Sequence, residues 1–101
     1  MSFQKTRLDE SRELVRRAMD VAYGSYMEQE GKKYDSWRDL SIGQLADHLR
    51  HEVNEEIMGN VRRGEIGFLM HNAMDAVELA AMLMAKAQLM LGEKEGEDAR
   101  R

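Results

Sequence analysis

The chain has 101 residues, of which 15 are lysine or arginine and 19 are aspartate or glutamate, and it contains neither cysteine nor proline. This length predicts one domain. The lack of cysteine excludes disulfides and thiolate metal sites. The lack of proline leaves long stretches free to be helical. The net charge of −4 argues against nucleic-acid binding, and the lack of a signal peptide and of any uncharged run of about 18 residues predicts a soluble, cytoplasmic protein with no membrane partner.

The first predicted helix covers about residues 8–29, where apolar side chains recur at helical spacing and Gly31 provides a stop. A polar stretch, residues 31–39, follows it and holds the only tryptophan, Trp37. This tryptophan is either a loop aromatic that covers the core or a surface on which a base stacks.

The second predicted helix covers about residues 42–63, with Ser41 as an N-cap and Gly64 as a C-terminal stop. One face of this helix is apolar and is formed by Ile42, Leu45, Leu49, Val53 and Ile57. The sequence HEVNEE, residues 51–56, lies in its middle.

The third predicted helix covers about residues 65–91, ends at Gly92, and is apolar nearly all round. Such a helix must be enclosed by several partners, and two other helices of the same chain are too few to enclose it. We therefore expect residues 1–92 to form an all-α bundle that is completed by homo-oligomerisation, as a dimer or a tetramer. The charged residues 93–101 are expected to form a frayed or disordered tail.

The second helix carries carboxylates where an apolar face is expected. At about 100° per residue, Glu56 falls inside the apolar arc, whereas Glu55 lies on the other side of Glu52. The three glutamates therefore span about 100° of the helix surface, with Glu52 in the middle. Burying a carboxylate is costly unless it is paired or binds a metal ion.

The third helix has the same anomaly, because Asn72 and Asp75 interrupt an apolar stripe between Phe68 and Leu79. If the two helices pack antiparallel around a turn at Gly64, Asn72 and Asp75 lie near the glutamates. Converging carboxylates repel one another unless a cation lies between them. Oxygen ligands favour Mg²⁺ or Mn²⁺, which can clamp a triphosphate and help to generate a hydroxide nucleophile.

An ordinary solvated face is the alternative interpretation of these carboxylates. In it, Glu52 and Glu56 lie at the edge of the core and pair with Arg62, Arg63 or Lys86. We interpret the histidines as surface groups or as groups that lie beside the carboxylates without binding a metal ion. His48 and Glu52 have the i, i+4 spacing of metal ligands, but the sequence has no HExxH or ExxH motif, which counts against a di-iron bundle.

These segments together resemble a known family. The second helix reads LADHLRHEVNEEI from Leu45 to Ile57, and the third reads NAMD from Asn72 to Asp75, followed by AVELAAMLMAKA. This arrangement resembles the MazG-like all-α nucleotide pyrophosphohydrolases, whose pattern is E-x-x-E followed by E-x-x-D, and the resemblance covers about residues 37–90. It implies a dimeric or tetrameric helical bundle that hydrolyses (d)NTPs to the monophosphate and pyrophosphate, as nucleotide-pool housecleaning.

By this resemblance, Glu52, Glu55 and Asp75 occupy three of the family's four metal-ligand positions. The fourth position departs from the pattern, because Asn72 stands where the family has glutamate and an amide oxygen brings no charge. Glu56 is the candidate catalytic residue, as an extra ligand or as the group that orients the attacking water. The remaining candidates are Glu78 and His48 as additional ligands, and Trp37 and Lys86 as substrate contacts.

Two other functions stay open at this point. One is a catalytically degenerate member of the family that binds a nucleotide or a protein partner without turnover. The other is a purely structural helical dimer whose acidic residues are solvated.

Overall fold

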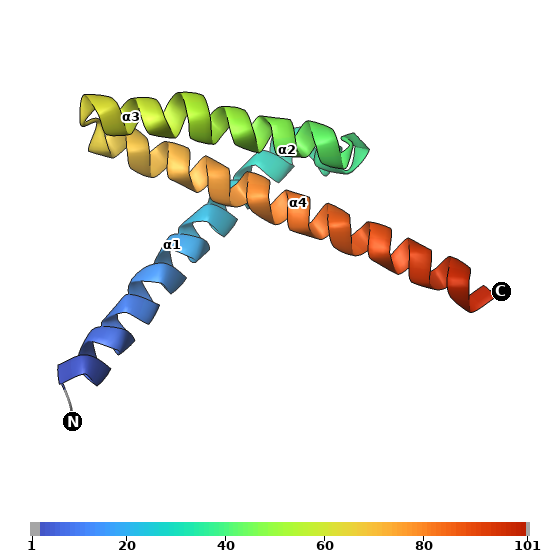
Figure 1. Ribbon diagram of the computed structural model, residues 1–101, viewed down its shortest axis with the longest axis horizontal. Helices are drawn as coiled ribbons and strands as arrows, with labels where there is room; N and C mark the ends of the chain where they lie inside the picture. Colours follow the sequence, from blue (N-terminus) through green and yellow to red (C-terminus); the bar gives the residue numbers. More distant parts are fainter. Residues whose placement is uncertain (1–2, 101) are drawn as a thin grey trace.

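The computed structural model describes residues 3–100, and it describes the side chains of residues 5–94. Within that range every regular element is a helix, so the all-α prediction is confirmed (Figure 1). The elements in chain order are α1 (Phe3–Lys33), η1 (Ser36–Asp39, a 3₁₀ helix), α2 (Ile42–His51), η2 (Glu52–Ile57, a π-helix), α3 (Met58–Arg63) and α4 (Ile66–Arg100).

The predicted second helix is present as one continuous rod made of α2, η2 and α3. Ser41 begins it with a capping box: its hydroxyl accepts from the backbone N–H of Gln44 at 3.1 Å, and the Gln44 side chain accepts from the Ser41 N–H at 2.8 Å. Gly64 ends it in the left-handed conformation, with φ of 68°, which glycine adopts without steric cost. Both predicted boundaries are therefore confirmed.

The middle of this rod is π-helical, which the sequence analysis did not foresee. The N–H of Met58 donates to the carbonyl of Val53, five residues earlier, whereas an α-helix bonds four residues earlier. The wider turn changes the faces on which the following side chains lie. Glu56, which we expected inside the apolar arc, is exposed in the single chain, as is Val53 of that arc.

Two predicted helix ends are also wrong. The first helix runs through Gly31 to Lys33, and α4 runs through Gly92 to Arg100 instead of ending there. One glycine inside a helix costs only about 1 kcal/mol, which the flanking helical residues can outweigh. Residues 93–100, which we expected to be frayed or disordered, thus continue α4, and Arg101 lies outside the described residues.

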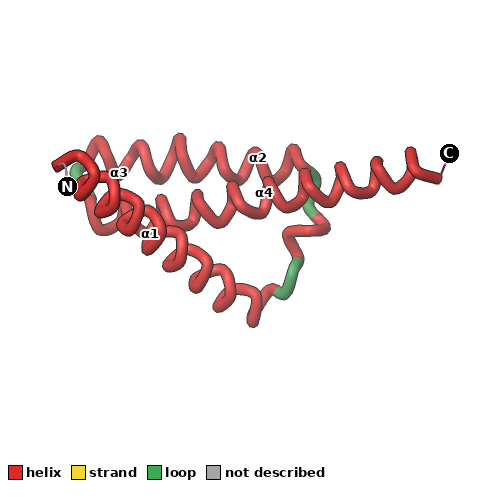
Figure 2. Tube along the Cα trace, turned by 90° about the horizontal axis from the view of Figure 1, so that it is seen from below, coloured by secondary structure: helices red, strands yellow, loops and turns green. Residues whose placement is uncertain are grey.

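The rod packs antiparallel along α4, and α1 crosses the two on one side (Figures 1 and 2). The core between them is small: of the apolar side chains in residues 5–94, only Leu45 and Ala22 are buried. The N-terminal part of α1 and the C-terminal part of α4 project beyond the packed region (Figure 1). The radius of gyration is accordingly 17.4 Å, against about 13 Å for a compact domain of this length.

The apolar surface of α4 is largely uncovered in the single chain. Phe68, Met70 and Met84 are between 66% and 70% exposed. Residues Ile66–Lys94 are also long and apolar enough to cross a membrane by length and composition alone, with a mean hydropathy of 1.2. The same test is passed by core helices of soluble proteins, and this helix carries Asp75, Glu78 and Lys86, which are costly to place in lipid.

We predict that Leu45→Ala lowers the free energy of unfolding by about 2–5 kcal/mol, because Leu45 is fully buried where α2 meets α4 and its loss leaves a cavity. Urea unfolding followed by circular dichroism measures this. The matched control is Leu8→Ala on the exposed part of α1, where we expect less than about 1 kcal/mol. Equal effects of the two substitutions would contradict the assignment of Leu45 to the core.

Candidate functional site

Glu52 of η2 and Asp75 of α4 lie on the two helices that pack along each other, close enough for the charge of Asp75 to raise the pKa of Glu52. Burial raises the pKa of the Glu52 carboxyl above its ordinary value, and the nearby charges of Asp75 and Glu56 raise it further. Its Oε1 atom is buried and has no hydrogen-bond partner. The antiparallel packing thus brings two carboxylates from neighbouring helices together, as the spacing around Gly64 predicts.

Glu78 lies one turn beyond Asp75 on α4 and is the most deeply buried carboxylate among the described side chains. It is 5% exposed, and neither of its carboxyl oxygens has a hydrogen-bond partner. Burial raises the pKa of Glu78; the neighbouring Ser25 hydroxyl of α1 lowers it, and Asp75 raises it again. Ser25 and Asp75 therefore lie beside the carboxyl group, although neither makes a hydrogen bond of normal geometry with it.

His51 and His71 lie near Glu52 and Asp75. His71 Nε2 lies 3.7 Å from Asp75 Oδ2, one helical turn apart on α4, and the His71 side chain is exposed. His51 and His71 both act to lower the pKa of Glu52, although burial and the carboxylates outweigh them. A protonated histidine at either position would partly offset the negative charge of the site.

The structure does not bring all the predicted ligands together. Glu55 and Glu56 are exposed on the π-helical segment, and His48 is exposed and lines a separate hollow with Trp37 and Leu79. Within the part of the chain whose side chains are described, no group of three or more histidine, aspartate or glutamate side chains is arranged to hold a metal ion. Glu52 and Asp75 are thus the nearest approach to the predicted ligand set.

Asn72 takes part in a chain of side-chain hydrogen bonds at the turn between α3 and α4. Its Nδ2 donates to Asn60 Oδ1 at 2.7 Å, and Asn60 Nδ2 donates to Glu65 Oε1 at 3.2 Å. Arg63 Nε donates to the same Glu65 oxygen at 2.7 Å. Asn60 is 3% exposed, so these bonds satisfy a polar group that is costly to bury alone. The position that departs from the family pattern therefore helps to hold the helix turn.

The predicted substrate contacts occupy a different part of the structure. The Lys86 ammonium donates to the backbone carbonyl of Arg38, which ties α4 to η1. Trp37 Nε1 donates to the Tyr26 hydroxyl at 3.0 Å and is partly buried. Trp37 lies beside α1 and lines the hollow that α1 forms with α4, and both roles that the sequence left open for it stay open.

The solvated-face alternative is only partly realised. Glu56 is exposed, as that alternative requires, but the ion pairs found among residues 5–94 do not join Glu52 or Glu56 to Arg62, Arg63 or Lys86. Arg63 instead pairs with Glu65 at 2.7 Å.

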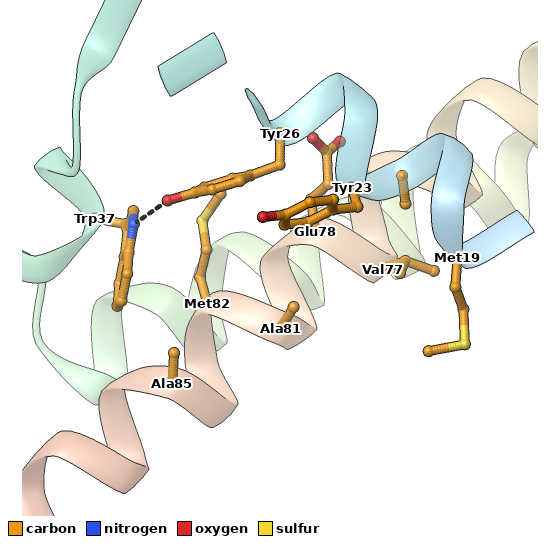
Figure 3. Close-up of a pocket in the computed structure, with 10 residues that line it drawn as sticks. Met19, Tyr23, Tyr26, Trp37, Val77, Glu78, Ala81, Met82 and Ala85 are labelled. Carbon is orange, nitrogen blue, oxygen red and sulfur yellow. Dashed lines mark hydrogen bonds between the residues drawn. The ribbon is translucent and has the colours of Figure 1, made fainter. Parts of the chain in front are cut away.

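Sequence reasoning missed the contribution of α1. A hollow of about 340 Å³ lies between α1, η1 and α4, and Glu78 lines it together with Tyr23, Tyr26, Trp37 and Met82 (Figure 3). Tyr23 and Tyr26 of α1 lie three residues apart, a spacing that by itself does not distinguish a site from the packed face of a helix. These tyrosines differ from ordinary packing residues only in lying next to Glu78. That placement depends on how α1 crosses α4.

We predict that Glu78→Gln makes folding stability less dependent on pH. The folded-state pKa of Glu78 lies above the ordinary 4.5, so the wild-type chain loses stability as the pH rises from about 4.5 through the raised pKa. The melting temperature of the variant relative to wild type should thus increase over this window and then level off. Thermal unfolding at a series of pH values measures the difference.

The control for that series is Glu10→Gln on the exposed surface of α1, which should give no comparable change. A difference between Glu78→Gln and wild type that stays constant with pH would contradict the burial of an unpartnered carboxyl group at this position.

We predict that Asn60→Ala lowers the free energy of unfolding by about 1–3 kcal/mol, because it leaves the amide of Asn72 and one bond to Glu65 unsatisfied. The exposed Asn54→Ala serves as the matched control. A double-mutant cycle with Asn72→Ala should be non-additive, since the two asparagines share a hydrogen bond. Simple additivity in urea unfolding would show that this bond contributes nothing.

Comparison of the chain with protein-family models, with curated proteins and with solved structures gives no match. The functional argument therefore rests on the residues and their arrangement.

Proposed function

We propose that this chain is a cytoplasmic Mg²⁺- or Mn²⁺-dependent hydrolase that converts a nucleoside or deoxynucleoside triphosphate to the monophosphate and pyrophosphate. The observation that carries the proposal is the meeting of Glu52 and Asp75 between two antiparallel helices, with an oxygen of Glu52 buried and unpartnered. A divalent cation is the partner that best suits such a pair.

The side chains at this point offer oxygen atoms, which are the ligands that a hard divalent cation prefers. Glu52 and Asp75 supply two carboxylates, and the Asn72 carbonyl oxygen is a third oxygen donor, since its amide nitrogen is engaged with Asn60. Glu55 is exposed one turn from Glu52 and would have to rotate toward them. The cation, when bound, would neutralise triphosphate oxygens and make a bound water more acidic.

The chain's own residues have two tasks in this reaction. Glu56, next to Glu52 on the π-helix and close enough to affect its pKa, is free in solvent to orient the attacking water and to accept its proton. Water then forms a bond with the α-phosphorus, the bond between that phosphorus and the bridging oxygen breaks, and pyrophosphate leaves. π-Helical turns frequently lie at functional sites, where they change the direction of a few side chains.

We further propose that the working form is a homo-oligomer. The uncovered apolar residues of α4 and the projecting α1 leave one chain with little core of its own. Monomeric proteins rarely expose contiguous apolar surface of this extent. A second copy packed on α4 would cover it, which supports a dimer or tetramer.

A nucleotide-binding module without turnover is the second candidate, and one observation favours it. Asn72 brings no charge to the cation, and the described side chains form no preassembled group of three ligands. Binding of nucleotide without release of pyrophosphate is the result that this alternative predicts.

We predict that purified protein releases pyrophosphate from at least one NTP or dNTP when Mg²⁺ or Mn²⁺ is present and not when a chelator is added. Asp75→Ala should reduce the rate by at least about 100-fold, because it removes one of two inward carboxylates. Asp47→Ala, on the exposed face of α2, is the matched control and should retain full activity. Full activity of Asp75→Ala in a folded protein would overturn the assignment.

Asn72→Glu distinguishes the two candidate functions. If the wild type releases no pyrophosphate but the variant does, the wild type is the binding module and Asn72 is the reason. The added carboxylate would face Asn60 Oδ1, so Asn72→Gln is the control for a disturbed turn.

A further inference from the structure

One side of α4 carries a regular repeat of apolar residues that the other described helices leave uncovered. Its large members recur every seven residues, at Met70, Val77, Met84 and Leu91, and their side chains are between 45% and 70% exposed. Alanines recur at the same interval between them, at Ala73, Ala80 and Ala87, and Ile66 begins the series. The steps from Ile66 to Leu91 therefore alternate strictly between four and three residues, which is the spacing by which two helices pack along each other. We call these eight residues the α4 seam.

The α4 seam lies away from both the rod and the proposed cation site. Met84 follows Asp75 by nine residues, so their side chains leave α4 on opposite sides, about 180° apart. Glu78, which is buried where α1 crosses, lies about 120° from Met84 around the helix. A third neighbour on the seam would therefore enclose α4 without covering Asp75.

The alternation of large and small residues makes the α4 seam complementary to itself in one orientation. In a parallel pair, equivalent residues face each other, so that methionine meets methionine and alanine meets alanine. In an antiparallel pair the two kinds of position face each other, so that large side chains lie over small ones. Large side chains opposite small ones interdigitate without voids, which is how close-packed interiors are built.

We propose that two copies of the chain pair through their α4 seams in antiparallel orientation, with the two-fold axis at the level of residues 78–79. Residue numbers that face each other then add up to the same total, and the whole seam is used. Val77 faces Ala80 of the partner subunit, Met84 faces Ala73 of the partner subunit, Met70 faces Ala87 of the partner subunit, and Leu91 faces Ile66 of the partner subunit. This pairing rests on the proposed homo-oligomer and names its surface and its orientation.

The exposed area is on the scale that a stable dimer needs. The large side chains of the seam expose roughly 600 Å² together, against about 800 Å² that each partner of a stable interface buries. The hollow between α1 and α4 adjoins the seam, because Val77 lines it together with Met19 and Tyr23 of α1 (Figure 3). These two side chains are 60% and 62% exposed, and they supply the remaining area at the edge of the interface.

The regularity of the seam favours a second copy over a lipid surface. Lipid tails accept apolar residues at any spacing, whereas a strict repeat of large and small residues is needed only against a helix of matching pattern. Soluble monomers rarely leave so long an apolar strip uncovered.

The chain has no cysteine, so cysteines introduced into the seam report its neighbours directly. In the proposed pair, residue 80 lies close to the axis, and Ala80→Cys should link to its own copy through a short bismaleimide. Met70→Cys should not link to itself, because the two copies of residue 70 lie about 25 Å apart along the helices. Co-expressed Met70→Cys and Ala87→Cys chains should link to each other. Asp47→Cys, on the exposed face of α2, is the control and should stay unlinked.

A charge in the seam gives a second measurement. Met84→Glu should shift the mass in light scattering from twice 11.7 kDa to 11.7 kDa, because the pair would bury the added carboxylate. Met27→Glu on α1, at a side chain that is 51% exposed, should leave the dimer intact. Circular dichroism checks that both variants keep their helices, and the cysteine links decide the question if Met84→Glu unfolds.

Self-linking of Met70→Cys would indicate a parallel pair and overturn the proposal, as would a wild-type chain that stays monomeric at all concentrations. A monomer that sediments with phosphatidylcholine vesicles would assign the seam to lipid instead. A dimer without these links would leave the homo-oligomer standing and exclude this surface. Pyrophosphate release is read separately: a monomer that releases it would retain the hydrolase proposal, and a dimer with the expected links that releases none would retain the interface.

Discussion

The burial of carboxylates between the helices is the constraint on which the rest of this structure depends. One oxygen of Glu52 and both oxygens of Glu78 are shielded from solvent and make no hydrogen bond of normal geometry. Placing such groups inside a protein is unfavourable unless a cation or a donor completes them. Asn60, which is also buried, has hydrogen bonds on both sides, to Glu65 and from Asn72. This contrast between the carboxylates and Asn60 supports the proposed cation site.

Glu52 and Glu78 lie in surroundings that differ in chemical character. Glu52 lies beside Asp75 and Glu56 and is flanked by histidines, so its surroundings are charged and suit a cation with phosphates. Glu78 is buried where α1 crosses α4, with Ser25 and Asp75 beside its carboxyl group and aromatic and small apolar side chains around it. One turn of α4 separates Asp75 from Glu78.

The uncovered apolar surface of α4 concerns a different question, namely how the folded chain gains enough hydrophobic stabilisation. With only two apolar residues buried in the described part of the chain, a single copy gains little hydrophobic stabilisation. The helices are nevertheless well defined locally: a capping box starts the rod at Ser41, and a left-handed glycine ends it at Gly64. The helices are thus well formed around a very small core. This combination supports the proposal that the chain packs against a copy of itself.

The sequence by itself determined the helical class, the N-cap at Ser41, the turn at Gly64 and the approach of Glu52 to Asp75. These follow from local rules, namely capping, the conformational freedom of glycine and residue counts on either side of a turn. The tertiary structure decided the rest. Residues 52–57 are π-helical, with the Met58 N–H bonded to the Val53 carbonyl, which no 100° periodicity anticipates. The crossing of α1 over α4 created the hollow at Glu78, because contacts between distant segments depend on packing and not on spacing along the chain.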